Sequence, residues 1–469
     1  MAYFVPSLQI NQEFKSIPSF TQSPLSALII GEILPTNGLN TITVGSGGTG
    51  YTSAPTVVIT DPTGHGASAT ATVVSGSVTA VTVVNHGFNY TSPTITFVGA
   101  GTGATATATI NSTRLTSPYI ENSITSGIGA VNTDADILAQ LGDISPLNPL
   151  AYACHMALLN SNNTTVYFGA VATNDLAGFT TVLSNYATKS RDYYGIVPLT
   201  TDATIEAAVI GHVNSMAAAS SNKARSCWLT AALSGSSSIQ SQVDALVASI
   251  STTTSSQTVI SSANGNTGPR RVHYVFPDTF YVDPTTQVAG YYLSAALAGL
   301  RSGSVPHQSL TNTQVVGPYY LDKCVATLTS TQLDQLAGAG VWIVTQNAKG
   351  GVAYTRQQLT SDNSGNLNYS EDSVTANVDS ITFGLHDAVA PFVGVYNITP
   401  AAVLKIKAAI DAELTFRLTG TYTERAGNQL VGYDIVSIKQ NAAILDQVDV
   451  VIELQVPYPA NFITITLSI

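Results

Sequence analysis

The chain has 469 residues, of which 10% are charged, and its formal net charge is -11. A chain of this length predicts roughly two to four domains. There is no basic run to neutralise phosphates and no apolar run of membrane-spanning length, so we expect neither nucleic-acid binding nor membrane insertion.

The first residues form a short extended segment. Within residues 1–20, Leu8 and Ile10 alternate with polar residues, and the segment has too few apolar residues for a core of its own. We therefore expect an N-terminal arm. Residues 27–32 are a mainly apolar run that predicts a buried strand, so residues 21–44 are assigned to the first part of an α/β core.

A repeat follows, in which Gly, Thr, Ala, Ser and Val dominate. Residues 51–57 recur as 90–95, and residues 66–72 recur as 103–109. Each unit predicts β-branched strands separated by Gly and Pro turns, with almost no helix. We expect residues 45–112 to form a small all-β domain that is inserted into the core and faces outward.

From residue 113 to residue 369, strands and helices alternate. This pattern predicts βαβ crossovers and a mostly parallel sheet with helices on both faces. Strands are expected at residues 165–172, 193–199, 225–233, 257–261, 272–276 and 341–346, and helices include 205–218 and 285–301.

Two amphipathic helices begin the C-terminal domain. Ser370 is the expected N-cap of the first, and Thr399 with Pro400 is expected to start the second, which ends at Gly420. Apolar residues of the first helix recur at steps of three and four, which predicts one buried face. They are Val374, Val378, Ile381, Leu385, Val389 and Phe392.

Two alternating strands end the chain. Residues 448–456 alternate apolar with polar side chains, prolines follow at 457 and 459, and residues 463–469 alternate again. Because an unpaired apolar strand invites another chain, we expect a terminal arm at about 458–469 that joins its own sheet or a neighbour's. The candidate residues of intersubunit strands are Leu8, Ile10, Val450, Ile452, Leu454, Ile463, Ile465, Leu467 and Ile469.

The predicted fold class is an α/β core with a mostly parallel sheet, an α+β C-terminal domain and a small all-β inserted repeat domain. Each part follows from its own periodicity. The expected domains are an arm at 1–20, a core at 21–44 and 113–369, an insertion at 45–112, and a C-terminal domain at 370–469.

Signals for catalysis are weak. Residues 45–50 satisfy GxGxxG, but the sequence that follows contains Pro55 and predicts a β-turn, not the helix that dinucleotide binding requires. GxSxG, HExxH and P-loop motifs are absent. His155 and His212 stand singly among apolar residues and are interpreted as core or interface residues. We expect no catalytic, cofactor-binding or metal-binding residues, and no enzyme.

Four aspartates flank predicted elements. Asp278 and Asp283 follow a strand, where α/β proteins often keep catalytic carboxylates. A turn or capping role is favoured, because Asp283 precedes Pro284 as a helix N-cap would. Asp134 and Asp136 are expected to open a helix.

Cysteine usage indicates a reducing compartment. Cys154, Cys227 and Cys324 are widely spaced and form neither a CxxC motif nor a disulfide framework, so we expect them to be core residues. The N-terminus lacks a basic segment followed by an apolar core, and we expect folding in a cytoplasm.

The C-terminal residues carry a resemblance to a known family. The helix pair, with Asp379, Phe-Val-Gly at 392–394 and Asn-Ile-Thr at 397–399, resembles the C-terminal domain of contractile phage tail sheath proteins. Val-Asp-Val-Val-Ile at 448–452 and Pro-Ala-Asn-Phe-Ile at 459–463 are similar to that family's closing strands. The predicted strand near the N-terminus resembles its first core strand.

This resemblance implies a structural subunit of a bacteriophage virion, assembled in the host cytoplasm. Such subunits form hexameric rings that stack helically around a tail tube, and they contract to drive the tube through the host envelope before genome ejection. The implied partners are other copies of the chain, the tail tube protein, and the baseplate and tail terminator proteins. Two alternatives stay open: an α/β hydrolase with a pocket near Asp278, and a β-repeat surface adhesin.

Overall fold

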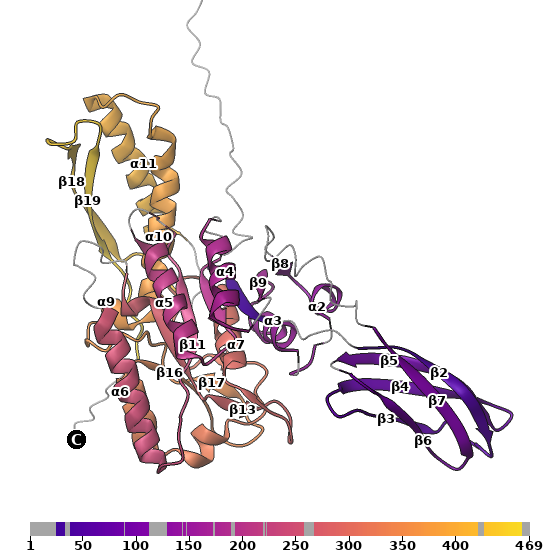
Figure 1. Ribbon diagram of the computed structural model, residues 1–469. Coiled ribbons are helices and arrows are strands. Elements are labelled where there is room, and N and C mark those ends of the chain that lie inside the picture. Colours follow the sequence, from indigo (N-terminus) through magenta and orange to yellow (C-terminus); the bar gives the residue numbers. More distant parts are fainter. Residues whose placement is uncertain are drawn as a thin grey trace, which may run out of the picture.

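The computed structural model has three parts. A mixed α/β core lies in the centre, a small β domain projects from one side, and a domain of helices with a β-hairpin projects at the top (Figure 1). The structure describes residues 25–32, 38–88, 90–111, 129–142, 144–146, 148–171, 174–188, 193–218, 221, 223–257, 267–420 and 426–461.

A nine-stranded sheet forms the centre of the core. In sheet order its strands are β15 (Gln314–Val315), β17 (Ala353–Thr355), β16 (Val341–Gln346), β12 (Val272–Phe276), β11 (Ser226–Thr230), β10 (Gly195–Pro198), β1 (Ala27–Glu32), β9 (Val166–Val171) and β8 (Gly129–Val131). The strands from β16 to β9 are paired in parallel, whereas the pairings of β8, β15 and β17 are antiparallel. The sheet is therefore mixed, with the predicted parallel arrangement at its centre.

Helices cover this sheet. They are α2 (Asp134–Gln140), α3 (Pro149–Leu158), α4 (Leu176–Ala187), α5 (Ala203–Ala217), α6 (Ile239–Gln257), α7 (Tyr291–Ser302) and α8 (Ser330–Gly338). α3 packs on α7, α4 packs on α5, and both pairs contact the sheet. The three cysteines are free and buried, which confirms their predicted place in the core.

One core helix is shorter than expected. The helix predicted at 285–301 begins at Tyr291, because β14 (Gln287–Ala289) pairs with β13 (Thr279–Tyr281). The Asp283 carboxylate accepts hydrogen bonds from the backbone N–H groups of Thr285 and Thr286, so it caps a hairpin turn and not a helix. The strand expected at 257–261 is also wrong at its first residue, since Gln257 ends α6; the rest lies outside the described residues.

The insertion is a six-stranded antiparallel sheet. In sheet order its strands are β6 (Thr94–Val98), β3 (Thr56–Thr60), β4 (His65–Val74), β5 (Ser77–Phe88), β2 (Gly38–Thr49) and β7 (Thr102–Asn111). The sheet begins at Gly38 and not at residue 45, because residues 38–44 pair with β7. Residues 45–50 lie at the end of β2 and in the turn before β3, so no helix follows the GxGxxG pattern.

The two repeat units interlock through tyrosine and glycine. The ring of Tyr90 covers Gly64 and the ring of Tyr51 covers Gly101, and both tyrosines are buried. A Cβ atom added to either glycine would lie 2.3 Å from the nearest ring carbon. Only glycine leaves room for these rings, so each unit completes the packing of the other.

A carboxylate adds a second link between the units. Asp61 accepts backbone hydrogen bonds from Thr63 and Gly64 of its own unit and from Thr91 and Ser92 of the other. Desolvation acts to raise the pKa of Asp61, but the four N–H donors outweigh it and lower the pKa below its ordinary value.

The C-terminal domain packs two long helices against a β-hairpin. Its elements are α9 (Leu367–Ser370), α10 (Asp372–Val389), α11 (Pro400–Thr419), β18 (Gly432–Gln440) and β19 (Val448–Gln455). The Thr399 hydroxyl accepts from the backbone N–H of Ala402, which confirms the predicted cap of α11. The N-cap of α10 is Glu371, one residue after the expected Ser370, because Ser370 belongs to α9.

We predict that the insertion can be excised without loss of the core. Gly38 and Asn111 are paired across β2 and β7, where paired Cα atoms lie about 5 Å apart, so a short Gly-Ser linker can replace residues 38–111. The apolar cluster of the insertion is separate from that of the core, so the thermal midpoint of the rest should be unchanged. Calorimetry of the excised and full chains measures this. A lower midpoint for the core would contradict it.

Candidate intersubunit surface

The C-terminal sheet has two strands, and both of its outer edges are unpaired within the described residues. The ladder runs from the pair Gly432 and Gln455 to the pair Gln440 and Val448, with a bulge at Val436. A two-stranded sheet is marginal by itself, and unpaired N–H and C=O groups at an edge accept a further strand. This hairpin is therefore the best candidate surface for a neighbouring chain.

The inner face of the hairpin belongs to its own subunit. Val450, Ile452 and Leu454, which the sequence marked as intersubunit residues, pack against the cluster that contains Ile410 and Leu414 of α11. These three side chains are therefore half-buried against the core of their own domain. What β19 leaves open to a neighbour is its backbone edge.

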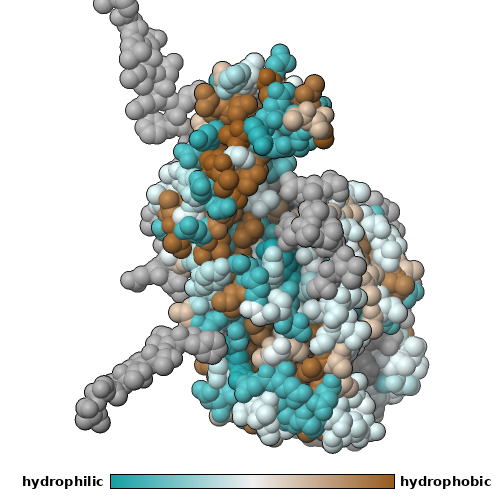
Figure 2. Space-filling view, turned by 90° about the vertical axis from the view of Figure 1, so that its left-hand side faces the viewer, coloured by the Kyte–Doolittle hydropathy of each residue, from teal (hydrophilic) through white to brown (hydrophobic). Residues whose placement is uncertain are grey.

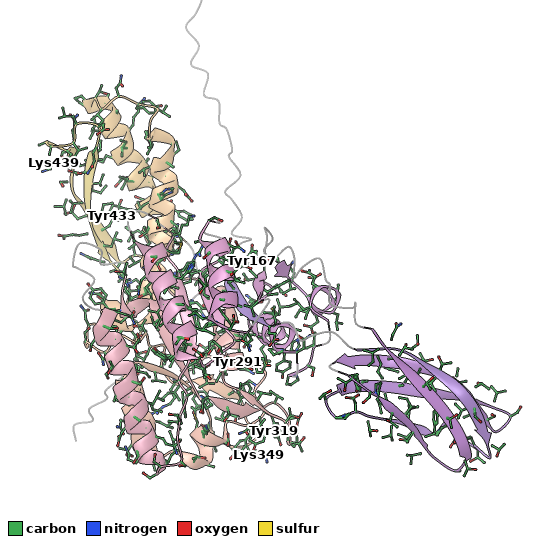
Figure 3. All side chains as sticks on the ribbon, viewed as in Figure 1. Tyr167, Tyr291, Tyr319, Lys349, Tyr433 and Lys439 are labelled. Atoms are coloured by element: carbon green, nitrogen blue, oxygen red, sulfur yellow. The ribbon has the colours of Figure 1, made fainter. Side chains whose placement is uncertain are left out.

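Contacts with α11 hold β18 in place. The Tyr433 hydroxyl lies 2.7 Å from the Asp411 carboxylate and 2.9 Å from the Thr415 hydroxyl, both on α11 (Figure 3). Lys439 lies near the other end of the strand (Figure 3). The outer face carries Val436 and Val451, each 50% exposed. One face is therefore packed, and the other is free and partly apolar.

The remaining candidate residues lie outside the described part of the chain. They are Leu8, Ile10, Ile463, Ile465, Leu467 and Ile469. Their place in a strand of a neighbouring sheet stays a prediction.

Apolar side chains gather on the surface of the C-terminal domain (Figure 2). Val393 is 77% exposed and Leu445 is 71% exposed. Beside them, a cavity of about 250 Å³ lies between the α10–α11 connection and the start of β19, with Phe392 and Val448 in its lining. Exposed apolar patches of this kind mark interaction surfaces.

A buried ion pair joins this domain to the core. The Asp379 carboxylate on α10 accepts two hydrogen bonds from the Arg271 guanidinium and one from the Tyr194 hydroxyl, the last at 2.7 Å. Both charged side chains are fully buried. Desolvation is the largest single effect and acts to lower the pKa of Arg271, but the charge and hydrogen bonds of Asp379 together with the contribution of Tyr194 outweigh it, and the pKa is raised. The guanidinium therefore stays charged.

A second buried pair lies at the start of the same helix. Arg301 on α7 donates to the Asp372 carboxylate at 3.0 Å, and its guanidinium also donates to the carbonyls of Val305 and Gln308. Asp372 and Asp379 are seven residues apart, which places them on one side of α10. This side of α10 is turned away from the apolar stripe that the sequence predicted, and nothing in the sequence identifies the distant arginines as partners of the two aspartates.

The other candidate polar residues have structural partners. Asp278 binds the Lys323 ammonium at 2.5 Å and accepts from the backbone N–H of Leu233 at 3.0 Å, so it holds a turn. His212 contacts Arg225 at 2.7 Å, and burial lowers the pKa of His212 to about 3. Asp136 accepts from the backbone N–H of Thr133 in the predicted first turn of α2.

The described residues contain no group of three or more His, Cys, Asp or Glu side chains that could hold a metal ion. No helix among them is both long and apolar enough to cross a membrane.

Comparison with known proteins identifies the fold. No family model matches the chain, and no curated protein matches its sequence. The structure is similar to a chain of the anti-feeding prophage helical sheath in its contracted state, with a TM-score of 0.55, 12% identity, and coverage of 100% of this chain and 99% of that one. The structure is also similar to a chain of the same prophage's contracted baseplate, with a TM-score of 0.54, 11% identity and the same coverage of both chains.

A third solved structure is also similar to this chain. The contracted sheath complex of an extracellular contractile injection system, PVC, gives a TM-score of 0.52 at 12% identity and covers 74% of this chain and 88% of that one. The protein therefore has the fold of contractile sheath subunits, which confirms at the level of the fold the resemblance found in its sequence.

We predict that Arg271→Ala destabilises the subunit by about 3–5 kcal/mol, because it leaves the Asp379 carboxylate buried without its partner. The matched control is Arg356→Ala, which removes a partly exposed pair with Asp334 and should cost less than about 1 kcal/mol. Urea unfolding of both variants measures the difference. Equal losses would show that the buried pair does not hold the junction.

Proposed function

We propose that this protein is the sheath subunit of a contractile tail. Hexameric rings of the subunit stack helically around a tail tube, and contraction drives the tube through the host envelope. The observation that carries the proposal is the two-stranded C-terminal sheet, whose two edges are unpaired among the residues that the structure describes, on a fold similar over the whole chain to that of a contracted sheath. The protein is a virion component, assembled in the host cytoplasm.

Neighbouring subunits are joined by donated strands. Residues 463–469 of one copy and the segment around Leu8 and Ile10 of another add to the free edges of β18 and β19. Each main-chain hydrogen bond contributes about 0.5–1.5 kcal/mol net, so a donated strand of several residues holds firmly while its linker bends. Pro457 and Pro459 set the direction in which the last strand leaves the hairpin.

The stored energy of the extended sheath lies in contacts between subunits. The extended state is a kinetic trap, and contraction improves these contacts. A force applied to β18 or β19 is transmitted through their packed face to α11 and α10. The Asp379–Arg271 pair then transmits this force to the core. Rings can then move relative to one another without separating.

Other partners follow from the same assignment. The sheath meets the tail tube, the baseplate and the tail terminator, and the exposed apolar surface around Val393 and Leu445 is a candidate contact for one of them. The inserted β domain projects away from the C-terminal domain (Figure 1). In the proposed sheath, this domain faces outward.

The two alternatives have weaker support. A hydrolase needs convergent polar groups near Asp278, but that carboxylate is engaged by Lys323 and a backbone N–H. A surface adhesin rests on the β-repeat alone, which makes up a small part of the chain.

We predict that removal of residues 463–469 leaves a folded subunit that cannot polymerise, because the donated strand is lost while the described fold is kept. Negative-stain electron microscopy should show striated tubes from the full chain and none from the shortened one. A matched pair tests the mechanism: Ile465→Asp with Leu467→Asp should abolish tubes, whereas Thr464→Ser with Thr466→Ser should keep them. Normal tubes from the shortened chain would refute strand donation by residues 463–469, and the absence of tubes from the full chain would refute the sheath proposal.

A further inference from the structure

The inserted β domain carries almost no charge. Asp61 is the only Asp, Glu, Lys or Arg between residues 38 and 111, and its carboxylate already accepts four backbone hydrogen bonds. Charged side chains on end strands normally keep identical strands apart, because like charges that face each other repel. Two copies of this domain can therefore approach each other without that repulsion.

The strand β7 ends the sheet of the insertion and has a regular outer edge. It has ten residues and pairs only with β2 among the strands that the structure describes; β6 contacts β7 without forming a ladder with it. The end strands of the core sheet, β15 and β8, have only two and three residues. The bulges of the β2–β7 ladder place their extra residues, Asn40 and Gly45, in β2, so β7 itself is not bulged. A long end strand without charge, proline or bulge can pair with a further strand.

The middle of β7 reads the same in both directions. Residues 105–109 are Thr-Ala-Thr-Ala-Thr. We propose that the outer edge of β7 pairs antiparallel with β7 of a second copy of the chain, about a two-fold axis at Thr107. In this register, Thr107 lies opposite the same residue of the second copy, and Thr105 lies opposite Thr109. Each residue of the segment then faces a residue of its own type.

Both faces of β7 fit this register. Thr105, Thr107 and Thr109 are exposed on the outer face. The hydroxyl of Thr109 already lies 2.7 Å from that of Thr41 on β2, so threonines that face each other across two strands of this domain form hydrogen bonds. On the inner face, residues 106 and 108 are half-buried alanines that pack against the apolar cluster of the insertion. Because alanine is small, two such strands can pair without steric conflict.

The pairing joins subunits that do not belong to one sheath. Copies within a polar sheath are related by rotation and translation along its axis, which provides no two-fold axis between neighbours. A two-fold pair therefore links free subunits, or the insertions of two sheaths that lie side by side. The insertion projects from the core, where another copy can reach it (Figure 1). The link between sheaths rests on the proposed function, whereas the pairing itself does not.

Cysteine crosslinking of the full chain tests the pairing. Thr107→Cys should form a disulfide-linked dimer on mild oxidation, because the two Cα atoms would lie about 5 Å apart. The matched control is Thr70→Cys, which is also exposed but lies on β4, between β3 and β5. The control should give about tenfold less dimer, because its paired neighbours keep it beyond disulfide distance of a second copy. The native cysteines are buried and do not compete.

Two further measurements test the register and do not depend on a single variant. Thr105→Cys and Thr109→Cys should each give little dimer alone, whereas a mixture of the two should give as much as Thr107→Cys. Without cysteine, Thr107→Lys should abolish the dimer in sedimentation velocity, and mixing that chain with Thr107→Glu should restore it. Circular dichroism checks that every variant is folded.

Three results would overturn the pairing: a Thr107→Cys chain that stays monomeric, as much dimer from Thr70→Cys, or as much dimer from Thr105→Cys alone as from the mixture. The first would mean that the edge of β7 does not meet a second copy. All measurements use dispersed subunits after any tubes have been pelleted, so they do not depend on polymerisation. Failure of the sheath proposal appears separately, as the absence of tubes from the full chain.

Discussion

The buried contact of Asp379 with Arg271 and Tyr194 joins the C-terminal domain to the core. Charges removed from water are costly unless they are paired and hydrogen-bonded, so α10 is held at one position on the core. The same helix supplies Ile381 to the cluster beneath the hairpin. A buried ion pair therefore fixes where the open edges of β18 and β19 lie relative to the central sheet.

The inserted β domain and the C-terminal hairpin differ in how completely their strands are paired. In the insertion, each repeat unit completes the other through Tyr51 and Tyr90, and Asp61 satisfies backbone donors of both units. In the C-terminal domain, α11 packs against one face of the hairpin, while the backbone edges of its two strands remain without partners within the described residues. The interlocking of the repeat units is complete within one chain, whereas both strands of the hairpin have room for strands from other chains.

Local patterns were predictable where one segment contains all the atoms that decide its conformation. The cap of α11 at Thr399 and the alternation of β19 are of this kind. The helix at 285–301 was misplaced because pairing with β13 draws residues 287–289 into a strand. The insertion begins at Gly38 and not at the predicted residue 45, because residues 38–44 pair with β7, which lies at the C-terminal end of the repeat.

Sequence periodicity was enough to predict the class of each part: a repeat of β-strands, an alternating α/β core, and two helices followed by strands. These depend on periodicities of a few residues, which any short segment displays. The three-dimensional fold was needed to show that Arg271 and Arg301 pair with the acidic residues of α10, and that Asn461 lies at the core beside a cavity. Such contacts join residues far apart in the chain, and they arise only when packing brings those residues together and removes the water between them.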